Sequence, residues 1–324
     1  MPSLKEIKGR IASVNSTRKI TSAMKMVASS KLHHAQVAIQ NMLPYEELLE
    51  HILKSFLAAE AEAQTIFDQE RPVKRAALVV MTSNSSLCGG FNANTIKMML
   101  HAVDEYDKTI GRDNVEIYPI GRKVYEKAKK MGLAVQGEYS ALADKPNVQE
   151  CIEIAMELGK KFAEGQIDKV ELIYHHFKSA GSQILTRKTF LPIDVQSELN
   201  ADKERDLETV IATKESQEYL KKRGEKERSR EGEQEVKPLN DNFIVEPDMN
   251  TVLSQLLPKL AHLSLYTALL DSNASEHAAR MVAMQTATDN ADELLRELNL
   301  QYNKSRQQAI TSELLDIVGG SVNN

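Results

Sequence analysis

The sequence predicts an α/β protein in which two long terminal helices pair as an antiparallel coiled coil, with a small, largely parallel α/β domain attached. Three observations support this fold class. Glycine and proline are scarce, at 14 and 9 of 324 residues. Apolar stripes of helical spacing lie at both ends of the chain, and between them the pattern changes to short Val-rich runs. Aromatic residues make up only 5%, with no Trp, which disfavours an all-β fold.

The N-terminal helix is expected over residues 1–60. Glycine is absent between positions 9 and 89, and apolar residues recur three or four apart. The stripe consists of Leu4, Ile7, Ile11, Val14, Ile20, Met24, Val27, Leu32, Ala35, Ile39 and Met42. Ser3 followed by Glu6 resembles a capping box, so the helix is predicted to start near the chain end. Pro44 is expected to bend the helix without ending it, because the apolar pattern continues beyond it.

The α/β domain is expected over residues 73–195. The run at 76–81 is apolar and rich in Val, and a turn-like sequence follows it, so it predicts a buried strand. Further strands are predicted at 116–120, 170–176 and 184–191, and helices at 93–104, 123–130 and 148–163. This alternation indicates a largely parallel sheet, with a hairpin across 178–181 at one edge.

The C-terminal helix is expected over residues 248–320. After Pro258 there is no proline, and the next glycine is Gly319. Its stripe has near-heptad spacing and contains many small residues, which allow a partner helix to approach closely. The α/β segment lies between the two helices in sequence, so they are predicted to pair antiparallel. The end of the helix also carries Leu314, Leu315, Ile317 and Val318 where a free end is normally polar, which indicates a partner.

Residues 196–240 form a fourth, charged part. Positions 198–237 hold 12 acidic and 10 basic residues, so this segment has little with which to bury a core. We expect it to project into solvent, and we treat a regulatory or species-specific contact as a hypothesis.

No strong catalytic, cofactor or metal motif is present, so we expect no catalytic, cofactor-binding or metal-binding residues. The turn at 86–92 follows a predicted strand and precedes a helix; it fits a structural turn better than a phosphate cradle, because neither common glycine-rich fingerprint occurs. Cys88 is expected to be a buried thiol rather than a nucleophile. The pairs His33-His34 and His175-His176 are adjacent in sequence, so their rings should not converge on one ion.

The sequence says less about the cellular compartment and the binding partners than about the fold. Two cysteines form no disulfide framework, and no signal peptide or membrane span is expected. The first 34 residues carry seven basic side chains against one Glu: Lys5, Lys8, Arg10, Arg18, Lys19, Lys25 and Lys31. This pattern fits a solvated helix face or a surface for an acidic partner. If the partner is acidic, nucleic acid is the less favoured candidate, because the region lacks aromatic residues for stacking and the chain has net charge −5.

Several motifs, in order, resemble the gamma subunit of rotary F-type ATP synthases. They are residues 20–28 (ITSAMKMVA), 87–90 (LCGG), 276–284 (EHAARMVAM), 287–290 (ATDN), 302–307 (YNKSRQ) and 310–320 (ITSELLDIVGG). The similarity covers both ends and the middle and leaves out about residues 196–240. It implies a Rossmann-like foot domain and a role as the central rotor shaft of a proton-translocating ATP synthase, with no catalytic residue in this chain.

The resemblance also implies partners. The shaft would stand inside a ring of alpha and beta subunits, and the foot would sit on the membrane c-ring beside the epsilon subunit. Met24, Lys25 and Arg280 match positions that couple the shaft to the catalytic subunits, with Lys31 nearby. Gln307, Thr311 and Glu313 match ring contacts, and Glu246 matches a foot residue facing the c-ring and epsilon. The chain would be peripheral to the cytoplasmic face of the inner membrane and bind no nucleic acid.

One departure from the family pattern concerns the residues before the Leu-Cys-Gly-Gly turn. The family usually has Asp, a basic residue and Gly there, whereas this chain has Asn84, Ser85 and Ser86. The charged segment lies where the chloroplast form carries a redox-regulatory segment, but it contains no cysteine, which excludes thiol regulation. Two other functions stay open: a coiled-coil adaptor, which predicts a homodimer, and a nucleotide-binding α/β enzyme, which predicts nucleotide binding by the foot.

Overall fold

The computed structural model describes residues 3–58, 67, 71–193, 205, 246 and 249–321. The chain divides into two compact units. We call residues 1–29 with 280–324 the coil unit, and residues 30–279 the sheet unit. Two long helices, α1 (Leu4–Ala58) and α8 (Met249–Ser321), contribute to both units.

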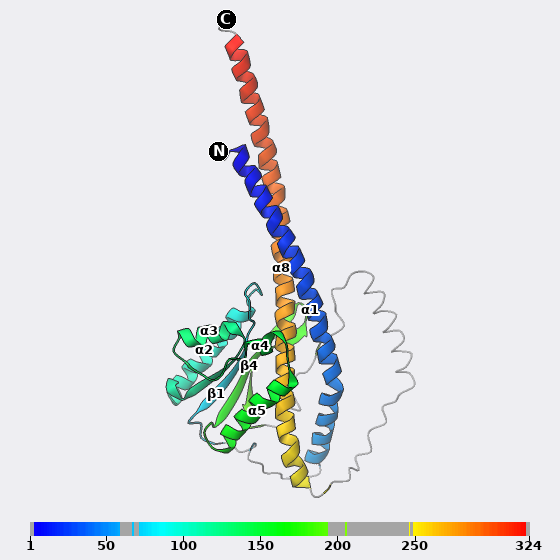
Figure 1. Cartoon of the computed structure of the whole chain (residues 1–324), viewed down its shortest axis with the longest axis vertical. Coiled ribbons are helices and arrows are strands. Elements are labelled where there is room, and N and C mark those ends of the chain that lie inside the picture. The colour runs from blue at the N-terminus through cyan, green and yellow to red at the C-terminus, as the bar shows by residue number, and fades with distance from the viewer. Residues whose placement is uncertain are drawn as a thin grey trace, which may run out of the picture. The chain divides into compact units, whose positions relative to one another are not determined.

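The coil unit is an antiparallel pair of helices (Figure 1). Thr21 Oγ1 lies 2.8 Å from Thr288 Oγ1, and Arg18 Nη1 donates to Asp292 Oδ1 at 2.9 Å. The residue numbers of the contacting positions rise along α8 as they fall along α1, so the two helices run antiparallel. The buried positions recur at heptad spacing on each helix, as in a coiled coil: Ile7, Thr21 and Ala28 on α1, and Met284, Ala291 and Leu298 on α8.

The predicted start of α1 is confirmed, with one difference. Ser3 Oγ accepts a hydrogen bond from the Glu6 backbone N–H at 3.3 Å, as a capping residue does. The Glu6 carboxylate does not complete the reciprocal box but pairs with Arg10 at 3.0 Å. Pro44 lies inside α1 and does not end it, and Pro258 lies inside α8.

The sheet unit contains a five-stranded sheet of order β3-β2-β1-β4-β5. The strands are β1 (Ala76–Met81), β2 (Val115–Ile120), β3 (Ala134–Val135), β4 (Lys169–Ser179) and β5 (Ser182–Leu191). The first four are parallel, and β5 pairs antiparallel with β4 at the edge, which confirms the predicted hairpin. Every residue of β1 is buried, because this strand has a neighbour on each side and a helical layer on each face.

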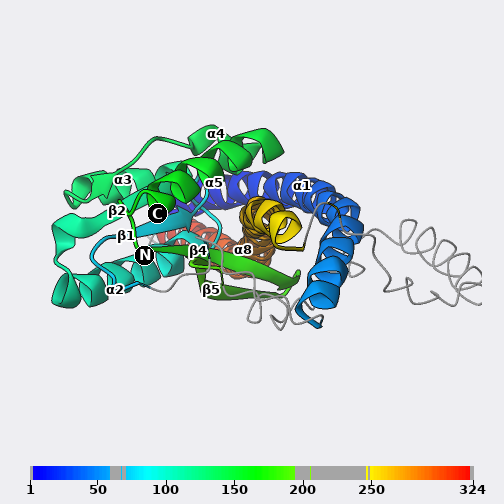
Figure 2. The same ribbon diagram turned by 90° about the horizontal axis from the view of Figure 1, so that it is seen from below.

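Helices cover both faces of the sheet (Figure 2). Ala76, Leu78 and Val80 pack with α2 (Phe91–Thr109) and α3 (Arg122–Lys130). The alternate residues of β1 pack with α4 (Ser140–Asp144), α5 (Val148–Ala163) and residues 257–269 of α8. The α/β prediction is therefore confirmed, with part of α8 serving as a layer of the domain.

The element boundaries follow the sequence closely where the elements are long. The strand at 76–81 and the helix at 148–163 have the predicted bounds, whereas α2 is longer at both ends, Phe91–Thr109 against a predicted 93–104. Three short elements were not predicted: α4, β3 and a 3₁₀ turn, η1 (Arg112–Asn114). None of the described helices has an apolar stretch long enough to cross a bilayer.

Candidate functional site: a partner-contact surface

The turn after β1 is filled by its own side chains. Asn92 Oδ1 accepts from the Ser83 backbone N–H at 2.9 Å, and Asn92 Nδ2 donates to Ser83 Oγ at 2.8 Å. The Cys88 side chain is buried, 3.1 Å from Asn92 Nδ2. Gly89 adopts a φ of 58°, which a glycine takes without strain. The polar side chains of this turn bond to one another, so the geometry favours the structural turn.

Asn84 holds the same end of the sheet together. Its Nδ2 donates to Ser140 O at 2.6 Å and to Asp144 Oδ2 at 2.7 Å. Its Oδ1 accepts from the Arg122 backbone N–H at 2.8 Å, at the start of α3. An ionised aspartate has no hydrogen to donate, so it could not make the contacts with Ser140 O and Asp144 Oδ2. This gives a structural reason for Asn at position 84, where the family usually has Asp.

The other candidate chemical groups are buried and separated. Burial raises the pKa of Cys151 to about 12, so its thiol stays protonated. The rings of His175 and His176 lie on opposite faces of β4, as adjacent strand residues do. His175 Nδ1 is 3.2 Å from Thr95 Oγ1 on α2, whereas His176 Nδ1 is 2.7 Å from Asp271 Oδ2 on α8. They cannot bind the same ion.

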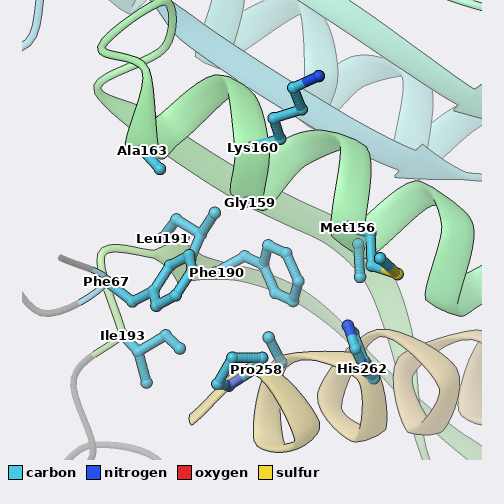
Figure 3. A pocket seen from close by; sticks show the side chains of 12 residues that line it. Phe67, Met156, Gly159, Lys160, Ala163, Phe190, Leu191, Ile193, Pro258 and His262 are labelled. Atoms are coloured by element: carbon cyan, nitrogen blue, oxygen red, sulfur yellow. The ribbon is translucent and has the colours of Figure 1, made fainter. Parts of the chain in front are cut away.

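An apolar cavity of about 290 Å³ lies between α5, β5 and α8 (Figure 3). Phe67, Phe190, Leu191 and Ile193 provide much of its lining, and the Lys160 amine points away from its centre. Burial lowers the pKa of His262, another lining residue, which favours its neutral form. Such a lining offers few charged groups for a nucleotide phosphate, so it does not support the nucleotide-binding alternative.

Both helices of the coil unit carry large exposed apolar side chains. Ile20, Met26 and Val27 of α1 are 59%, 65% and 58% exposed, and Leu300 of α8 is 71% exposed. Single exposed apolar residues are common, but several on one helix pair indicate a surface that binds other proteins.

The C-terminal part of α8 extends past the N-terminal end of α1 within the coil unit (Figure 1). Every residue from 306 to 315 is exposed. Ile310, Leu314 and Leu315 are 50%, 58% and 66% exposed. An exposed helix end is expected to be polar, and no described part of the chain covers this apolar end, so it indicates a binding partner.

The residues predicted for partner contact fall into three groups. Met24 and Lys25 are half-buried on α1, and Arg280 is 9% exposed on α8. Gln307, Thr311 and Glu313 are exposed near the end of α8, where the Thr311 hydroxyl donates to Gln307 O at 2.9 Å. Glu246 is exposed and lies before α8.

Two features were missed from the sequence. Ile20 and Val27 are predicted members of the α1 stripe, but both are exposed, each directly before a buried residue, Thr21 or Ala28; a strict heptad count from Ile7 places Ile20 and Val27 outside the stripe. In the charged segment, the structure describes only Arg205, whose side chain is 5% exposed. The expected projection into solvent is wrong for this residue, because buried carboxylates pair with it; the rest of 196–240 lies outside the described residues.

Comparison with known proteins decides the family. A sequence model of the ATP synthase family matches residues 3–322. The ATP synthase gamma chain of Phocaeicola vulgatus is 53% identical over 322 residues, covering 99% of this chain and 100% of the relative. The chain belongs to the ATP synthase gamma chain family. The gamma chain of Flavobacterium johnsoniae is 39% identical over 326 residues, with 99% and 98% of the two chains covered.

Solved structures agree on the fold of this family member. A rotor chain of the Euglena gracilis mitochondrial ATP synthase, in rotational state 1, matches with a TM-score of 0.57 and 17% identity over 95% of this chain and 98% of that one. A chain of the Tetrahymena thermophila central stalk and c-ring matches with a TM-score of 0.50 and 23% identity over 83% and 99%. Family membership makes this chain a gamma subunit of an ATP synthase.

Proposed function

We propose that this chain transmits rotation from a membrane c-ring to the catalytic sites of an alpha/beta ring during ATP synthesis driven by protons. The observation that carries the proposal is the exposed apolar end of α8, at residues 306–315, in a member of the gamma-chain family. The solved relatives include central-stalk assemblies with a c-ring and with F1, which supports partners of this kind.

The mechanism follows from differential contact. A rotating element changes a neighbour's conformation only where its contacts differ between the neighbour's states. Met24, Lys25 and Arg280 in the coil unit would make such contacts with the catalytic subunits, and Gln307, Thr311 and Glu313 would contact the surrounding ring. Glu246 would face the c-ring and the epsilon subunit. The chain would then be peripheral to the cytoplasmic face of the inner membrane.

Arg280 provides the sharpest test of coupling. We expect Arg280→Ala to lower proton pumping per ATP hydrolysed more than it lowers assembly of the complex. Arg296→Ala is the matched control, because Arg296 is an exposed arginine on the same helix and in the same unit. Equal losses of pumping and assembly in Arg280→Ala would assign Arg280 a structural role instead.

The adaptor alternative predicts a different assembly. An adaptor would form a homodimer through its helices, whereas a rotor pairs its own two ends and purifies as one copy with each alpha/beta ring. Affinity purification of the tagged chain at its native expression level separates these outcomes. A homodimer without ring subunits would contradict the proposed function.

A further inference from the structure

A buried cluster of charged side chains joins three elements of the sheet unit. Asp271 of α8 is at its centre, with its side chain 1% exposed. Arg205, from the charged segment, and Glu46, from α1, have side chains 5% and 10% exposed. His176 of β4 donates from Nδ1 to Asp271 Oδ2 at 2.7 Å, with its side chain 10% exposed.

The geometry around Arg205 is that of a guanidinium fork. Nε donates to Asp271 Oδ1 at 2.9 Å, and Nη2 donates to Asp271 Oδ2 at 3.1 Å. The remaining terminal nitrogen, Nη1, lies 3.5 Å from Glu46 Oε2. An arginine provides this arrangement because its donors lie in one plane and point in different directions, which a lysine amine cannot reproduce.

Charge makes Arg205 necessary to the cluster. A buried carboxylate is costly without a compensating charge, and here Asp271 and Glu46 come from two different helices. Removing one partner of a buried ion pair destabilises a protein far more than removing both, because the remaining charge stays buried and uncompensated. Without Arg205, the two carboxylates would repel each other across α1 and α8.

We infer that Arg205 is a clamp, which ties the charged segment to α1 and α8 at Glu46 and Asp271 and stiffens this part of the chain. Arg205 is then attached to both long helices and does not face solvent. The value of this stiffness for rotation rests on the proposed function, whereas the clamp itself rests on the contacts of the described residues.

Amide hydrogen exchange of the full-length chain tests the clamp without depending on the proposed function. In Arg205→Gln we expect exchange at residues 42–49 of α1 and 268–274 of α8 to become faster by on the order of 100-fold. Arg205→Lys keeps the charge but loses the fork, so we expect a smaller acceleration. Arg122→Gln is the matched control, because Arg122 forms an exposed pair with Glu126 at 3.0 Å, and it should leave these rates unchanged.

A pair of deletions separates Arg205 from the rest of the segment. Deleting 206–237 keeps Arg205, and we expect it to preserve the slow exchange; deleting 198–237 removes Arg205 and should abolish it. Equal exchange in both deletions would overturn the inference, as would wild-type exchange in Arg205→Gln.

A variant that removes all three buried charges keeps the inference testable if Arg205→Gln does not fold. Arg205→Met combined with Asp271→Asn and Glu46→Gln leaves His176 an acceptor at position 271 and leaves neither carboxylate uncompensated. We expect this triple variant to fold and to exchange more slowly than Arg205→Met alone. If the triple variant unfolds as readily as Arg205→Met, the buried charges do not hold these helices together, and the inference fails.

Discussion

His175 should make the stability of this chain depend on pH in the acidic range. Its ring is 4% exposed, stacks on Phe91 with the ring centroids 4.5 Å apart, and lies 3.2 Å from Thr95 Oγ1. The Thr95 hydroxyl donates its one proton to Phe91 O at 3.0 Å, so His175 Nδ1 must be the donor to Thr95. Burial lowers the pKa of His175 from 6.5 to about 4, because the charged ring would lose its hydration.

The direction of the effect follows from the lowered pKa. The unfolded chain binds a proton at His175 below about pH 6.5, whereas the folded chain does so only near pH 4. Neutral His175 therefore makes its full contribution to the free energy of unfolding above pH 6.5, and this contribution is lost as the pH falls toward 4. A pKa difference of this size lowers the free energy of unfolding by about 2 kcal/mol between pH 7 and pH 5, and by about 3 kcal/mol between pH 7 and pH 4.

Denaturant unfolding of the full-length chain between pH 7 and pH 4 measures this contribution. His175→Phe keeps an aromatic ring beside Phe91 and cannot titrate, and His175→Gln is a second non-titrating variant. Carboxylates common to all three proteins also titrate here, so the quantity to compare is the change in free energy of unfolding with pH. We expect the wild type to lose about 2 kcal/mol more than either variant between pH 7 and pH 5. Parallel curves would refute the argument that His175 is buried as the neutral form.

Three further substitutions test separate parts of the structure. Asn84→Asp should lower the free energy of unfolding by about 2–3 kcal/mol, because both donor contacts are lost and a carboxylate then faces Asp144; adding Asp144→Asn should recover part of the loss, and no recovery would contradict the pairing. Met284→Ala, at a site 4% exposed, should cost about 2–3 kcal/mol in thermal unfolding, whereas a cost below about 0.5 kcal/mol would place Met284 outside the packed seam. Leu315→Ser, at a site 66% exposed, should leave the melting temperature unchanged but weaken binding to the alpha/beta ring about 10-fold, and unchanged binding would argue against an apolar partner at this end.

Much of the fold was predictable because long elements repeat their pattern many times. The α1 stripe, the Val-rich β1 and the helix at 148–163 each follow a pattern that one substitution does not obscure. A strand of two residues, Ala134–Val135, and a helix of five, Ser140–Asp144, are too short for a period to be recognised. Their positions depend on the neighbours they pack against, such as β2 for β3.

The candidate site was predictable in part. The exposed apolar end of α8 followed from Leu314 and Leu315 standing where a free helix is polar, and the structure finds both exposed. The cluster of Arg205 with Asp271 was not predictable, because the two residues are 66 positions apart and the surrounding composition indicated solvent. A pattern of charges along the chain reports how a segment is hydrated on average, not which one side chain is buried.

Single-molecule rotation of the assembled complex tests the central claim most directly. Lys108 is exposed on α2 and both native cysteines are buried, so Lys108→Cys offers a selective attachment point for a probe on the sheet unit. With the alpha/beta ring fixed to a surface, we predict that ATP hydrolysis turns the probe in one direction and that the turning stops when ATP is removed. A probe that stays still while the same complexes hydrolyse ATP would contradict the assignment of this chain as the rotor.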